Sequence, residues 1–105
     1  MSELLWVAPT PKPKFILGKT VMTPGIANLI NELGLNPDYF IWRHHSGDWS
    51  EMCDEDAQSN TEALKGGARI FSAYELNHAV FGFEKLWVIT EADRSVTTIL
   101  LPSEY

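Results

Sequence analysis

The sequence predicts an α+β fold, in which an N-terminal strand and three helices are followed by a three-stranded antiparallel β-meander with the helices on one face. Residues 86–102 carry the clearest signal, because two runs rich in Trp, Val, Ile and Thr flank a polar turn at Asp93-Arg94. Two helix-start signals, Thr23-Pro24 and Asn36-Pro37, precede apolar residues at helical spacing. The length of 105 residues and the hydrophobic content of 45% suit a single domain with one core.

The N-terminal half is expected to form one strand and three helices. Residues 15–22 are the first strand. A helix then begins at Pro24 and ends at Gly34, because glycine suits a left-handed C-cap. The second helix begins at Pro37 and ends at the glycine-containing break of residues 46–48. It carries Phe40, Ile41 and His44.

The third helix begins near residues 50–54 and runs to Lys65, before the glycine pair at 66–67. Its first turns are acidic, as expected where carboxylates complement the positive end of the helix dipole. The meander strands are then residues 69–76, 86–92 and 96–101, with residues 77–84 as a connection. The helical and strand periodicities predict a core formed by Leu29, Ile30, Leu33, Phe40, Ile70, Val88 and Ile99.

Residues 1–14 are expected to form an extended arm ahead of the domain of residues 15–105. Three prolines at positions 9, 11 and 13 favour extended backbone, and the apolar run Leu4-Leu5-Trp6-Val7 precedes them. Such an arm packs on its own domain or joins two copies into a homo-oligomer. A frayed terminus is the alternative.

Charge and cysteine content restrict the classes of partner. The net charge of −6 repels phosphate backbones and disfavours nucleic acid as a partner. One cysteine, Cys53, excludes an internal disulfide and suits a reducing compartment. There is no membrane-spanning apolar run and no secretory signal pattern. We therefore expect a cytoplasmic protein without a membrane partner, and the residue spacings indicate no metal site and no cofactor.

The segment Arg43-His-His-Ser-Gly-Asp-Trp49 is the first candidate for chemistry. Histidine titrates near neutral pH, so His44 or His45 could transfer a proton, with Asp48 orienting an imidazole and Trp49 forming an apolar wall. The structural alternative is a helix end, where basic side chains complement the negative end of the dipole.

The C-terminal strands hold the other candidates. Arg69 and Ser72 have opposite parity on their strand and should face opposite sides of the sheet. A two-residue loop at Asp93-Arg94 would pair Thr90 with Thr97 and Glu91 with Val96. Thr–Thr pairs stabilise sheets, so these threonines have a structural explanation as well as a chemical one.

The chain resembles a family of small bacterial proteins known as plasmid-related or hypothetical proteins, carried on plasmids, prophages and integrative elements. The resemblance is carried by residues 43–49, which include the His-x-x-Gly-Asp-Trp string, by residues 69–74, and by residues 87–105, which include the Ile-Thr-Glu-Ala-Asp-Arg-Ser string. It extends over residues 17–105 and departs in the Pro-rich start and at residues 77–85. It implies a mobile-element context and assigns no activity.

Two functions are compatible with these features. The first is an accessory protein of a mobile element that binds a protein partner, such as a host defence or regulatory factor, through His45, Asp48, Trp49, Glu91 and Arg94. The second is a small metal-independent hydrolase whose layout is similar to that of small RNases. Its groups would be His44 or His45 as acid and base, Arg69 or Arg94 on phosphate, and Thr97 or Thr98 as donors. The acidity favours the first function, and whether the protein is an enzyme stays open.

Overall fold

The structure is a computed structural model that describes residues 13–76 and 85–105, apart from the side chain of Leu33. Its fold is α+β, as predicted. In chain order the elements are β1 (Lys19–Met22), α1 (Pro24–Leu33), α2 (Pro37–His45), α3 (Asp54–Gly66), β2 (Ile70–Glu75), β3 (Lys85–Thr90), β4 (Val96–Leu100) and the 3-10 turn η2 (Pro102–Glu104). Residues 1–12 of the expected arm at 1–14, and the expected connection at 77–84, lie outside the described residues.

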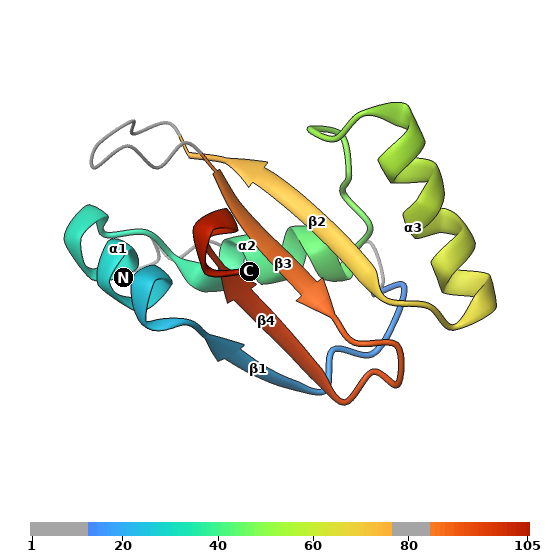
Figure 1. Ribbon diagram of the computed structural model, residues 1–105, viewed down its shortest axis with the longest axis horizontal. Helices are drawn as coiled ribbons and strands as arrows, with labels where there is room; N and C mark the ends of the chain where they lie inside the picture. The colour runs from blue at the N-terminus through green and yellow to red at the C-terminus, as the bar shows by residue number, and fades with distance from the viewer. Residues whose placement is uncertain (1–12, 77–84) are drawn as a thin grey trace, which may run out of the picture.

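The four strands form one mixed sheet in the order β1-β4-β3-β2. Strands β2, β3 and β4 form the predicted antiparallel meander. The sheet is not purely antiparallel, because β1 pairs in parallel with β4, with Lys19 opposite Val96 and Met22 opposite Ile99. Two edges result, β1 on one side and β2 on the other, and α3 lies beside the β2 edge (Figure 1).

Local signals define the helix ends as expected. The Thr23 hydroxyl accepts a hydrogen bond from the Ile26 amide, and the Asn36 side chain accepts one from the Asp38 amide. Gly34 ends α1 in the left-handed conformation, with φ of 68°. Within the described residues, no helix is both long and apolar enough to cross a bilayer.

The main core lies between the sheet and α2, which crosses behind the sheet in Figure 1. Leu29, Phe40, Ile70, Val88 and Ile99 are buried, as predicted. Ile30 is half-buried against this core. A second cluster, formed by Trp49, Ala63 and Ile70, lies beneath α3.

The first strand is shorter than predicted, because it begins at Lys19 and not at residue 15. Gly18 adopts φ of 68°, and a Cβ at this position would lie 2.4 Å from the Arg94 carbonyl oxygen. This left-handed residue breaks the extended run. The preceding residues turn instead towards the end of α2, where the Lys14 amide donates to the His45 carbonyl.

The β3–β4 turn also differs from the prediction. Thr90 does pair with Thr97, and the Glu91 amide donates to the Val96 carbonyl. However, the Arg94 amide donates to the Glu91 carbonyl, which centres the turn on Ala92 and Asp93. Arg94 follows in the left-handed region, with φ of 60°. The turn is therefore a longer one than a two-residue loop at Asp93-Arg94.

Candidate functional site

A chain of buried polar side chains connects α2 to three strands. His44 Nδ1 lies 2.6 Å from Ser72 Oγ, and His44 Nε2 lies 2.8 Å from Thr90 Oγ1. Thr90 Oγ1 lies 2.6 Å from Thr97 Oγ1, which donates to the Leu17 carbonyl at 2.7 Å. The four side chains, His44, Ser72, Thr90 and Thr97, are each 0% exposed.

The direction of each hydrogen bond follows from the Leu17 carbonyl, because it can only accept. The Thr97 hydroxyl donates its proton to this carbonyl, so in the Thr90–Thr97 bond Thr97 is the acceptor and Thr90 the donor. Since the Thr90 proton is used in this way, Thr90 accepts the hydrogen bond from His44. The proton of the imidazole is therefore on Nε2. The bare Nδ1 accepts a hydrogen bond from the Ser72 hydroxyl.

This environment keeps His44 neutral. Burial, together with electrostatic repulsion from His45 and Arg94, lowers the pKa of His44 to about 3. A neutral imidazole that is fully buried and has both nitrogens in hydrogen bonds cannot exchange protons with a substrate near pH 7. The contact between Ser72 and His44 resembles the Ser–His pair of hydrolases. Its role here is structural, because it stabilises the junction of α2 with the sheet.

Phe15 brings several of the predicted site residues together, and sequence reasoning missed it. Its ring meets the rings of His44 and His45 edge-on, at centroid distances of 5.1 and 5.7 Å. The Arg94 guanidinium lies 5.9 Å from the centre of the same ring. His45 is half-buried and lines a shallow surface depression with residues 13–17. The Gly47 loop and the Asp93 turn therefore share one end of the domain.

Arg94 is held by backbone carbonyls. Its guanidinium donates to Ala68 at 2.7 Å, to Glu91 at 3.2 Å and to Ala63 at 3.3 Å. These bonds tie the β3–β4 turn to the end of α3 and compensate for the left-handed backbone. Glu91 thus meets Arg94 through its carbonyl oxygen.

Asp48 does not orient an imidazole. It accepts from Arg43 Nε at 2.6 Å, and Glu51 binds Arg43 Nη1 at 2.6 Å. Burial opposes ionisation of Asp48, but the hydrogen bonds from Arg43 and Ser50 outweigh it and lower the pKa of its carboxyl group. The Arg43 guanidinium also lies over the Tyr74 ring, 4.4 Å from its centre.

Trp49 belongs to the cluster beneath α3, and its ring is 9% exposed. Arg69 lies away from His44, as its parity predicted, and donates to the Tyr105 hydroxyl at 2.7 Å. Thr98 faces the side of the sheet opposite to Thr97, because neighbouring residues of a strand alternate. The six candidates for hydrolysis therefore do not form one accessible cleft.

The β2 edge of the sheet is covered by side chains. The Asn60 carboxamide accepts from the Phe71 amide at 3.0 Å and donates to the Phe71 carbonyl at 2.5 Å. The Glu51 carboxylate accepts from the Glu75 amide at 2.7 Å. Asn60 thus takes the place of a peptide group on a fifth strand, which blocks pairing at this edge.

The β1 edge is different. The Lys19 amide donates to Ser95 and the Thr23 amide to Ile99, both on the β4 side. Backbone groups alternate in direction along a parallel strand, so the amides and carbonyls of Thr20 and Met22 point away from β4. No strand of the described residues pairs with them there. Thr20 is exposed, and Met22 is 45% exposed.

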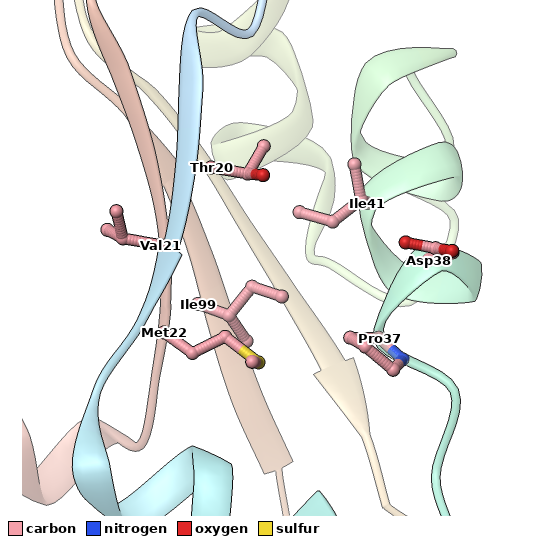
Figure 2. Close-up of a pocket in the computed structure, with 7 residues that line it drawn as sticks. All are labelled: Thr20, Val21, Met22, Pro37, Asp38, Ile41 and Ile99. Carbon is pink, nitrogen blue, oxygen red and sulfur yellow. The ribbon is translucent and has the colours of Figure 1, made fainter.

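A groove of about 170 Å³ runs between β1 and α2, beside this open edge. Figure 2 shows Thr20, Met22 and Ile99 on the strand side and Asp38 and Ile41 on the helix side, whereas Val21 points away. Pro37 completes the lining. The groove is large enough for an aliphatic side chain.

Among the described residues, no group of three or more His, Cys, Asp or Glu side chains could hold a metal ion. The chain matches no protein-family model, no curated protein and no solved structure.

Proposed function

We propose that this protein acts by binding a protein partner, and that the β1 edge with its groove is the binding surface. One observation carries the proposal. Of the two edges of the sheet, β2 is covered at Phe71 and Glu75 by Asn60 and Glu51, whereas the outward backbone groups of β1 have no partner among the described residues and lie beside a largely apolar groove. Proteins commonly block or shorten exposed edges, so an open edge beside a groove suits an added strand.

The wider biological role follows from the resemblance of the sequence. We propose a small acidic accessory protein of a plasmid or prophage whose partner is a host defence or regulatory factor. The acidity of the chain supports a protein partner with basic character over a nucleic acid.

The proposed surface differs from the one expected from sequence. Trp49 is buried and Arg94 is engaged by carbonyls, so their truncation would lower stability before it reported on binding. Of that set, His45 at the surface depression is the residue best placed to add to an interface.

The proposal is tested with a partner captured from the native host and then purified. Thr20→Pro removes an outward amide from an edge strand, which tolerates proline. Thr20→Val keeps the amide and is the matched control. We expect isothermal titration calorimetry to show a loss of at least tenfold in affinity for Thr20→Pro and none for Thr20→Val. Equal affinity of the two variants would remove β1 from the interface, and the lack of any reconstituted complex would overturn the proposed function.

The hydrolase is the second candidate, supported by the contact of His45 with Phe15 near Arg94. Its chemistry would depend on His45, because His44 is sealed. RNA cleavage that is present in the wild type and absent in His45→Ala would establish this alternative in place of simple binding.

A further inference from the structure

We infer that the segment recognised at β1 is an extended peptide that places one aliphatic side chain in the groove and a Lys or Arg against Asp38. This inference rests on the proposed function, and it adds the chemistry of the partner. It follows from three features of the edge, namely the backbone pattern, the groove and the charge.

The backbone pattern selects an extended segment. Thr20 and Met22 each offer one outward donor and one outward acceptor, two residues apart. A strand added beside β1 satisfies all four groups with its own alternate residues, since it has the same two-residue repeat. A helix cannot do so, because its backbone groups are bonded internally.

The groove selects the side chain. Its lining from Met22, Pro37, Ile41 and Ile99 is apolar, and Thr20 presents its side chain to the same space (Figure 2). A groove of this volume, near 170 Å³, accepts a Leu, Ile or Met side chain. Burying one aliphatic side chain favours binding, and the fixed place of the groove beside β1 determines which position of the peptide must carry it.

Charge selects the neighbouring residues. Asp38 lies on the rim in the first turn of α2 and is exposed. The chain as a whole carries a net charge of −6, which attracts a cationic segment. Residues two apart in a strand share a face, so a Lys or Arg two positions from the aliphatic residue points to the Asp38 side.

Two synthetic peptides of identical composition test the inference. Acetyl-Thr-Lys-Thr-Leu-Thr-Lys-Thr-amide places Leu and both Lys on one face. Acetyl-Thr-Thr-Lys-Leu-Lys-Thr-Thr-amide places Leu on one face and both Lys on the other. In ¹⁵N-labelled full-length protein, we expect the first peptide to bind at least fivefold tighter, with the largest amide shifts at Thr20 and Met22.

Variants separate the contributions. Asp38→Asn should weaken the first peptide at least threefold, whereas Asp56→Asn, the same charge change in the first turn of α3, should not. Equal affinity of the two peptides, or shifts centred away from β1, would overturn the inference. Binding that appears only after deletion of residues 1–12 would also overturn it, since the chain's own terminus would then be the occupant.

The two levels of the proposal fail separately. A reconstituted complex that needs the Thr20 amide, while neither peptide binds, would refute the peptide chemistry and keep the protein-binding function. Peptide binding at β1 without any host complex would refute the proposed function, and the edge would remain a peptide site.

Discussion

The carboxamide of Asn60 pairs with both backbone groups of Phe71, at 2.5 and 3.0 Å, although the two residues belong to different elements. This single side chain from α3 satisfies both outward backbone groups of Phe71 on the edge strand β2. It creates the asymmetry between the two sheet edges, because β1 receives no equivalent side chain from the described residues. The difference between the edges is therefore built by the packing of α3.

Replacing Asn60 by Ala should lower the free energy of unfolding by about 1–3 kcal/mol, because the part-buried backbone donor and acceptor of Phe71 lose their partner. Urea unfolding measures this change. The variant should also self-associate at high concentration, since β2 becomes a second open edge. Gln58→Ala, on the exposed side of α3, is the control and should leave both properties unchanged. A stable, monomeric Asn60→Ala protein would contradict the role assigned to this residue.

The buried state of His44 predicts a specific acid sensitivity. Its pKa is lowered to about 3 in the folded protein, against 6.5 for the free side chain. Between these values the unfolded chain binds a proton that the folded protein does not, so stability falls as the pH falls. We expect a loss of up to about 1.4 kcal/mol per pH unit below pH 6.5.

The measurement is urea unfolding at pH 7, 6 and 5, above the range in which Asp48, Asp93 and Glu104 become protonated. His44→Gln should be less stable at pH 7 and should lose most of this dependence. His45→Gln should keep it. A pH-independent wild type over this range would show that His44 is accessible to protons.

Trp49 carries a buried indole N–H that has no hydrogen-bond partner among the described residues. Replacement by Phe removes this unsatisfied donor and keeps most of the ring packing, so stability should stay within about 1 kcal/mol of the wild type or rise. Replacement by Ala should cost about 3–5 kcal/mol through the cavity that it leaves. Thermal unfolding distinguishes the two, and a large loss in Trp49→Phe would mean that the N–H has a partner.

The C-terminus caps the first helix. The Glu104 carboxylate accepts from the Thr23 hydroxyl at 2.5 Å and from the Gly25 amide at 3.0 Å, at the positive end of α1. Glu104→Ala should lower the free energy of unfolding by about 1–2 kcal/mol, as for loss of an N-cap. Ser103→Ala, in the same turn and exposed, provides the comparison. Equal melting temperatures for the two variants would rule out the cap.

The sequence by itself determined the features that depend on near neighbours. Thr23-Pro24 and Asn36-Pro37 begin helices because caps act within three residues. Alternation along the strand predicted that Arg69 and Ser72 face opposite sides of the sheet, and Ser72 is buried whereas Arg69 is exposed. The Thr90–Thr97 pair followed from a short turn, even though the turn itself is centred on Ala92 and Asp93. The buried network could have been found in the sequence from two signals, the predicted Thr90–Thr97 pairing and the face of the strand on which Ser72 lies.

Tertiary structure alone decided which distant groups meet. His44 binds Ser72 across 28 positions and Thr90 across 46, and Glu104 reaches Gly25 across 79. The parallel pairing of β1 with β4 is equally remote in sequence. No local propensity encodes such contacts, because they depend on how all the elements pack at once. For the same physical reason, His44, a residue type common in catalysis, became a neutral core residue, and β1 became the edge that no described strand pairs with.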